Sequence, residues 1–163
     1  MMDKPDIIDS FVLNGKTIDV DWYDASDIDE LPDVHWQQIY IIGNLNGKVP
    51  VVLYEKDRPN LPGGKTEPGE SIVETLNREI DEELHCQVLH WQPIGYQRLR
   101  SENAEPIYQL RVYSDLKSSG PFVRDPGGNV IGYKLISLDQ LNDEISYGKV
   151  GVRLMELAKP FFA

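Results

Sequence analysis

The segment from Leu61 to Cys86, LPGGKTEPGESIVETLNREIDEELHC, constrains the fold of this chain more than any other part of it. It opens with a proline and two glycines, which favour a turn, and it carries seven acidic side chains among twenty-six residues. From Glu70 to Leu84 the apolar residues recur at the period of an α-helix. The segment therefore predicts a turn and then a helix with one buried face, formed by Ile72, Val73, Leu76, Ile80 and Leu84.

Three glutamates, Glu79, Glu82 and Glu83, lie beside this apolar stripe on the helical wheel and not opposite it. Like charges three and four residues apart destabilise a helix by about a few tenths of a kcal/mol each, so another interaction must offset their repulsion. In one explanation the carboxylates are solvated and Arg78 pairs with Glu82. In the other they bind a hard cation such as Mg²⁺, which prefers oxygen ligands. The turn at 62–64 favours the cation, because glycine lets a backbone carbonyl approach the cluster closely.

The composition is that of an ordinary soluble globular protein, and we expect residues 1–163 to form a single domain. The formal net charge is −11, so the surface repels nucleic-acid backbones and anionic lipids. We therefore expect neither a nucleic acid nor a membrane as a partner. The single cysteine, Cys86, cannot form an intramolecular disulfide, and no secretory signal is visible at the N-terminus. These features predict a cytoplasmic location.

Two Asn-Gly dipeptides predict β-hairpins, because they supply the positive φ angles of a two-residue turn. The first is Asn14-Gly15, with strands over about residues 8–24, and the second is Asn46-Gly47. The acidic segment 24–33 between them is predicted to be a loop that could contain a short helical turn. Later elements are expected as strands at 87–100, 106–116 and 129–138, a loop at 117–129, a short helix capped by Ser137 or Asp139, and an amphipathic helix over about 149–162. This order predicts an α/β fold with helices flanking a mixed β-sheet.

The spacing of charged residues from Gly64 to Cys86 resembles the Nudix box of the Nudix hydrolases. That motif is a glycine, five residues, a glutamate, seven residues, and then Arg-Glu-aliphatic-x-Glu-Glu-x-Gly-aliphatic. Here Gly64 is followed by Glu70 and then by REIDEELHC at 78–86, so every charged position agrees. The motif's second glycine is replaced by His85, and Cys86 takes the aliphatic place. The strand order and the C-terminal helix also resemble the Nudix α/β/α sandwich.

The resemblance implies a site for Mg²⁺ or Mn²⁺, whose ligands would be Glu79, Glu82, Glu83 and the carbonyl of Gly64. It implies that Arg78 orients a glutamate through charge-assisted hydrogen bonds, and that Glu70 supports the site or a second metal. The reaction implied is attack of water on a pyrophosphate bond in a nucleoside diphosphate-linked or nucleoside triphosphate substrate. The alternative is a non-catalytic Nudix-fold module that binds a nucleotide and regulates a partner. Such modules usually lose glutamates of the box, and this chain keeps them all.

The substrate is not specified by the sequence, since no secondary signature of a Nudix subfamily follows the box. Arg98 and Arg100 alternate on one strand and could hold phosphate, although an ordinary solvated face explains them equally well. Aromatic side chains that could stack on a base, or belong to the core, are Tyr54, Tyr96, Tyr108 and Phe122. Loop carboxylates that could add to the site are Glu102, Glu105 and Asp125. A small nucleotide-type ligand is the partner expected, and a homodimer remains open.

His85 is expected to end the helix in the left-handed conformation, where glycine is the usual residue. Histidine tolerates positive φ better than most residues do. The proposed ligands lie a turn earlier, and their set is complete without it. We therefore expect a structural role for His85, with an acid or base role as the less favoured alternative.

Overall fold

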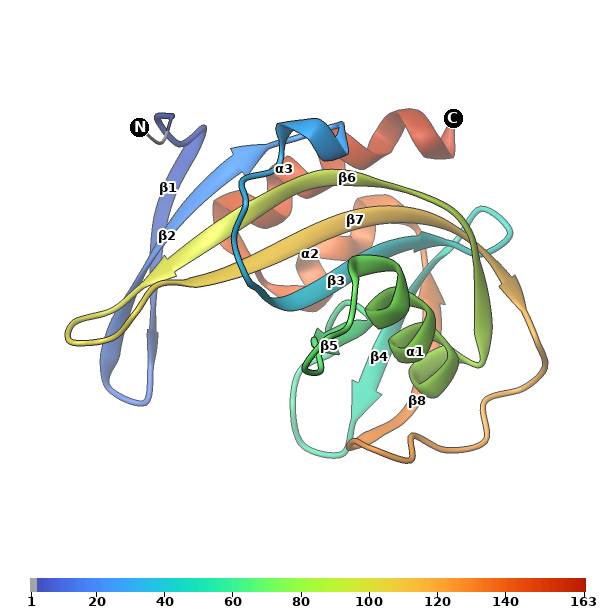
Figure 1. The fold of residues 1–163 in the computed structure, drawn as a ribbon. Coiled ribbons are helices and arrows are strands. Elements are labelled where there is room, and N and C mark those ends of the chain that lie inside the picture. Colours follow the sequence, from blue (N-terminus) through green and yellow to red (C-terminus); the bar gives the residue numbers. More distant parts are fainter. Residues whose placement is uncertain (1–2) are drawn as a thin grey trace.

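The computed structural model of the chain describes residues 3–163, and its strands form two sheets (Figure 1). The strands are β1 Ile7–Leu13, β2 Lys16–Asp24, β3 Trp36–Asn44, β4 Val49–Tyr54, β5 Gly63–Lys65, β6 Cys86–Arg100, β7 Ile107–Ser118 and β8 Val130–Ile136. The α-helices are α1 Ile72–Leu84, α2 Leu141–Ile145 and α3 Gly148–Ala158. Short 3₁₀ turns lie at Ile28–Glu30, Leu138–Gln140 and Lys159–Phe162.

The larger sheet has the strand order β1-β2-β6-β7-β3-β5, and the smaller sheet pairs β4 with β8. β3 and β7 run parallel, whereas the other pairs are antiparallel, so the larger sheet is mixed. This confirms the predicted α/β fold with a mixed sheet. Within residues 3–163, no helix has both the length and the apolar character required to cross a lipid bilayer.

The two faces of the larger sheet carry separate hydrophobic cores because side chains alternate along each strand. On β3, Ile39 and Ile41 pack in the core that contains α1, while Tyr40 and Ile42 belong to the core of α2 and α3. Figure 1 shows α1 in front of the central strands and α2 and α3 behind them. The sheet therefore separates α1 from the C-terminal helices, as the sandwich requires.

The two Asn-Gly turns have different outcomes. Asn14 and Gly15 have positive φ angles of 50° and 77° and join β1 to β2 in an antiparallel hairpin, as predicted. The turn at 46–47 also forms, and Leu45 and Lys48 exchange two backbone hydrogen bonds across it. The predicted hairpin is nevertheless wrong, because β4 leaves β3 and pairs with β8. β7 and β5 already occupy the two edges of β3, which leaves no edge for β4.

Helix α1 begins two residues later than predicted. Ser71 is its N-cap, and its side chain and that of Glu74 form a reciprocal capping box. The predicted apolar stripe is wrong at Val73, which is 45% exposed on the first turn. Thr75 is buried there instead, and its hydroxyl donates to Glu70.

The C-terminal ends of α1 and α3 show what stops each helix. His85 ends α1 in the left-handed conformation, with φ 52° and ψ 50°, as expected. Its Nδ1 lies 3.0 Å from the carbonyl oxygen of Pro121 in the loop after β7. The C-terminal helix stops at Ala158 and continues as a 3₁₀ turn, short of the predicted residue 162. Pro160 accounts for this, because it cannot donate the backbone hydrogen bond that continues an α-helix.

Substitution of His85 by glycine should leave the free energy of unfolding close to that of the wild type, because two effects oppose each other. Glycine removes the strain of a left-handed residue that has a Cβ atom, about 1 kcal/mol. It also removes the contact between His85 and Pro121, which is worth about 0.5–1.5 kcal/mol. Denaturant unfolding of the purified variant measures the difference.

The matched variant is His85→Ala, which loses the same ring but keeps the Cβ atom. We expect it to be less stable than the glycine variant by about 1 kcal/mol. Equal stability of the two variants would show that the left-handed conformation at this position carries no strain.

Candidate functional site

One hydrogen bond joins the backbone of the glycine turn before α1 to a side chain of the helix. The N–H of Gly63 donates to Oε1 of Glu83 at 2.6 Å. Gly63 has φ 137°, and a Cβ atom there would lie 2.1 Å from the carbonyl oxygen of Ile39 on β3. Only glycine can take this position, so the turn, β3 and the helix are held in one arrangement.

Gly64 brings bare backbone against the first glutamate of the cluster. A Cβ atom at this residue would lie 2.7 Å from Oε1 of Glu79. The absence of that atom leaves room between the main chain and the carboxylate. The sequence predicted this close approach, and the structure shows it.

Arg78 connects the acidic side chains with each other. Its guanidinium lies 2.7 Å from Glu70, 3.0 Å from Glu79 and 3.5 Å from Glu82, and it also donates to the carbonyl oxygen of Lys65. Hydrogen bonding to Arg78 lowers the pKa of Glu70 to about 2. The predicted positioning role of Arg78 therefore has a geometric basis, since one cation fixes three carboxylates.

Burial makes two of the carboxylates costly to ionise. Glu83 is only 5% exposed, and burial, followed by the charges of Glu79, Asp125 and Glu82, raises its pKa to about 8. Burial also raises the pKa of Glu79, and Arg78 partly offsets that rise. A second positive charge in the cluster would reduce the repulsion between the glutamate carboxylates.

The cluster has the ligand chemistry for a hard cation, but its oxygens are engaged elsewhere. Arg78 holds Glu79 and Glu82, and the Gly63 N–H holds Glu83. In residues 3–163, no group of three His, Cys, Asp or Glu side chains has a geometry that could hold a metal ion. The donor set of three carboxylates beside the uncovered backbone of Gly64 nevertheless suits Mg²⁺ or Mn²⁺.

The loop carboxylates named from the sequence have different positions. Asp125 lies in the loop before β8, and its charge raises the pKa values of both Glu79 and Glu83, so it belongs beside the cluster. Glu102 and Glu105 are exposed in the connection from β6 to β7. Figure 1 shows that connection at the end of the long strands away from α1.

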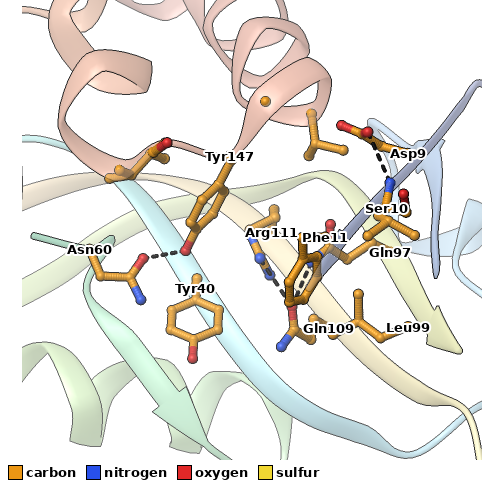
Figure 2. A pocket seen from close by; sticks show the side chains of 15 residues that line it. Asp9, Ser10, Phe11, Tyr40, Asn60, Gln97, Leu99, Gln109, Arg111 and Tyr147 are labelled. Atoms are coloured by element: carbon orange, nitrogen blue, oxygen red, sulfur yellow. Dashed lines mark hydrogen bonds between the residues drawn. The ribbon is translucent and has the colours of Figure 1, made fainter. Parts of the chain in front are cut away.

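A cavity of about 590 Å³ lies on the other face of the larger sheet, below the segment that joins α2 to α3 (Figure 2). Sequence reasoning missed it. The available signal was the presence of polar residues at inward-facing strand positions, such as an arginine between two core residues of β7. The polar side chains that line it include Tyr40, Asn60, Gln97, Gln109, Arg111 and Tyr147.

Tyr40 is the residue that links this cavity to the acidic cluster. It pairs with Gly63 across β3 and β5, and the charges of Glu83 and Glu79 contribute to the rise of its pKa, which burial dominates. Tyr40 therefore lines the cavity and also neighbours the edge strand β5, whose residue Gly63 contacts the carboxylate cluster.

The candidate substrate-binding residues of β6 do not line this cavity. Tyr96 stacks on Tyr23 at 4.9 Å between ring centroids and belongs to the core on the α1 face. Arg98 and Arg100 both bind the carboxylate of Asp21 on β2. The other aromatic candidates pack against the α1-side core; they are Tyr54, Tyr108 and Phe122.

Comparison with known proteins places the fold. A sequence model described as the NUDIX domain matches residues 38–153, more than half of the chain. A crystal structure of a variant of the Bacillus subtilis pyrophosphohydrolase BsRppH is similar, with a TM-score of 0.67, 18% identity, and coverage of 93% of this chain and 96% of that one.

Two further solved structures are similar. A NUDIX hydrolase from Nitrosomonas europaea has a TM-score of 0.61 and 18% identity, with 76% of this chain and 88% of that chain covered. An ADP-ribose pyrophosphatase from Streptococcus suis has a TM-score of 0.53 and 17% identity, with 77% and 91% covered. No curated protein matched the chain. The domain match spans the glycine turn, the acidic helix and most of β3, β6 and β7, and this chain is a member of the Nudix hydrolase family.

Proposed function

We propose that this protein hydrolyses a pyrophosphate bond in a nucleoside diphosphate-linked or nucleoside triphosphate substrate, and that it requires Mg²⁺ or Mn²⁺. The observation that carries the proposal is the partly buried carboxylate cluster on α1, in which Glu79 lies against the backbone of Gly64, Glu83 accepts from the N–H of Gly63, and Arg78 joins Glu79 to Glu82. Two similar structures are described as a pyrophosphohydrolase and an ADP-ribose pyrophosphatase, which agrees with this reaction.

The residues of the cluster would have distinct roles. Glu79, Glu82 and Glu83, with the carbonyl of Gly64, would hold the cation. When bound, such a cation neutralises diphosphate oxygens and lowers the pKa of a ligated water. Arg78 and Glu70 would fix the carboxylates before substrate arrives, so that little reorganisation is needed during the reaction.

The cavity would hold the organic part of the substrate. Its volume of about 590 Å³ is in the range of small-molecule sites, and its wall at Tyr40 adjoins the cluster. The net charge of −11 disfavours a nucleic acid as substrate and agrees with a cytoplasmic enzyme acting on a small nucleotide.

Hydrolysis should depend on the cation and on the buried glutamates. We expect Glu82→Gln and Glu83→Gln each to lower kcat by at least about a hundredfold, because each removes a charged ligand from the centre that stabilises the transition state. Release of phosphate or nucleoside monophosphate from a substrate panel, with Mg²⁺ and then with EDTA, measures this.

The matched control is Asp81→Asn, which changes an exposed carboxylate on the same helix and should leave kcat within a few-fold. Activity that persists in EDTA, or in both glutamine variants, would contradict the metal site. Nucleotide binding without hydrolysis in the wild type would instead favour the regulatory module.

Gly64→Ala should lower activity while the protein stays folded, because its Cβ atom would lie 2.7 Å from a movable carboxylate oxygen of Glu79. We expect a fall in kcat of about tenfold or more, in line with misplacement of a reacting group by about 1 Å. Kinetics and thermal unfolding of the same sample separate a loss of activity from a loss of stability.

The neighbouring variant Gly63→Ala supplies the contrast. Its Cβ atom would meet the backbone of β3 at 2.1 Å in a residue with φ 137°, so we expect loss of stability as well as activity. If the two variants were equally stable and equally active, the close approach at Gly64 would have no bearing on the site.

A further inference from the structure

The cavity contains a buried cation without an acidic partner. Arg111 on β7 is only 2% exposed, and its Nη2 donates to Oε1 of Gln109 at 3.1 Å. Its Nε and Nη1 have no hydrogen-bond partner among residues 3–163. Three of the five N–H donors of a guanidinium belong to these two nitrogens. Figure 2 shows Arg111 at the centre of the lining residues.

Four other arginines have acidic partners, and the remaining two, Arg58 and Arg124, are exposed to solvent. Each of Arg78, Arg98, Arg100 and Arg153 lies within an ion-pair distance of an Asp or Glu. Arg111 has no ion pair of this kind in the described part of the chain, although it is the most deeply buried of the five.

The aromatic neighbours of Arg111 do not replace an anion. Its guanidinium carbon lies 4.7 Å from the ring centre of Tyr40 and 5.5 Å from that of Tyr147. Such contacts are weaker than the penalty for removing a cation from water. Asp9 also lines the cavity, but its carboxylate accepts from the backbone N–H groups of Ser10 and Lys149, and no ion pair joins it to Arg111 in the described residues. An anion that enters the cavity would supply the counter-charge.

The neighbouring glutamines hold Arg111 in place without neutralising it. Arginine only donates, so Oε1 of Gln109 must face it, and the same oxygen accepts from Gln97 at 2.7 Å. Nε2 of Gln109 then donates to Gln38 on β3. This series of hydrogen bonds spans three strands and fixes one nitrogen of the guanidinium, while the other two nitrogens stay available.

The position of Arg111 relates it to the acidic cluster. Arg111 pairs with Tyr40, and Tyr40 pairs with Gly63, so the three residues lie in one row across β7, β3 and β5. Adjacent strands are about 4.8 Å apart, which places Arg111 about 10 Å from the turn that contacts Glu79 and Glu83. The two sites lie on opposite faces of the sheet, and β5 is its edge strand, so a nucleotide that passes around this edge could contact both the cluster and Arg111.

We propose that Arg111 is a binding residue for a phosphate group of the substrate, the phosphate that stays on the nucleoside after hydrolysis. Gln109 is its positioning residue. The identity of this phosphate rests on the proposed function, whereas the binding of an oxyanion to Arg111 does not. A phosphate suits the site because it accepts hydrogen bonds and supplies the negative charge that no described residue brings within ion-pair distance of Arg111.

The test is ligand binding in EDTA, which needs no catalysis. Thermal unfolding of the wild type is measured with inorganic phosphate, with the four ribonucleoside 5′-monophosphates and with the corresponding nucleosides. We expect at least one monophosphate to raise the Tm by several degrees and its nucleoside to raise it less. Equal shifts with a monophosphate and its nucleoside would overturn the proposal. A shift with phosphate alone would show that the nucleoside is not required.

Two variants change the charge of the site in different ways. Arg111→Met removes the cation, so we expect the shift from monophosphate to disappear while the Tm without ligand stays equal or rises. Gln109→Glu places a carboxylate where Oε1 accepts from Arg111, so the site neutralises itself. We expect this variant to have a higher Tm without ligand and to lose the shift, although Arg111 remains.

The control is Arg153→Gln, which removes an arginine that pairs with Asp24 outside the cavity and should keep the shift. A shift that persists in Arg111→Met would overturn the proposal. If that variant does not fold, an undiminished shift in Gln109→Glu would overturn it. When hydrolysis is measured in Mg²⁺, Arg111→Met and Gln109→Glu should raise KM at least tenfold and leave kcat within a few-fold. Binding in EDTA without any hydrolysis in Mg²⁺ would contradict the proposed function and leave the Arg111 site standing.

Discussion

The hydrogen bond from the N–H of Gly63 to Glu83 holds the rest of the site in place. It joins a turn that is itself paired with β3 to a helix that packs on the same sheet. Because Glu83 is buried, this bond is also the contact that favours its charged form, against desolvation that raises its pKa. A shift of either element would leave a buried carboxylate unsatisfied, which is costly. The geometry of the cluster is therefore tied to the sheet and not to a mobile loop.

Charge is arranged in two opposite ways on the two faces of this sheet. On the α1 face, several carboxylates share one arginine, Arg78, and the cluster has excess negative charge. On the other face, Arg111 has aromatic and amide neighbours but no carboxylate within ion-pair distance among the described residues. A cation would suit the first site and an anion the second. A metal-bound nucleotide, the ligand proposed above, has both characters, and its cation would offset the net charge of −11 when a polyanion binds.

The sequence predicted local features well where the signal was local. The left-handed end of α1 at His85, the turn at Asn14 and the approach of Gly64 to Glu79 all follow from conformational limits within a few residues. It failed where a choice depended on distant partners. The turn at 46–47 formed as expected, but β4 joined β8 because other strands had taken both edges of β3. Val73 lies at an apolar position of the helical wheel and is still exposed, whereas its neighbour Ile72 packs against the core.

The sequence by itself determined the acidic helix, its glycine turn and the three glutamates that gather on one side of the helix, because spacing along a helix decides which side chains share a face. Only the tertiary structure decided what surrounds them. Arg98 and Arg111 are both strand arginines, and no local rule separates them. Asp21 on the adjacent strand β2 neutralises Arg98, whereas the strands beside Arg111 present amides and an aromatic ring. Strand pairing brings distant segments together, so the electrostatic environment of each arginine depends on the complete fold.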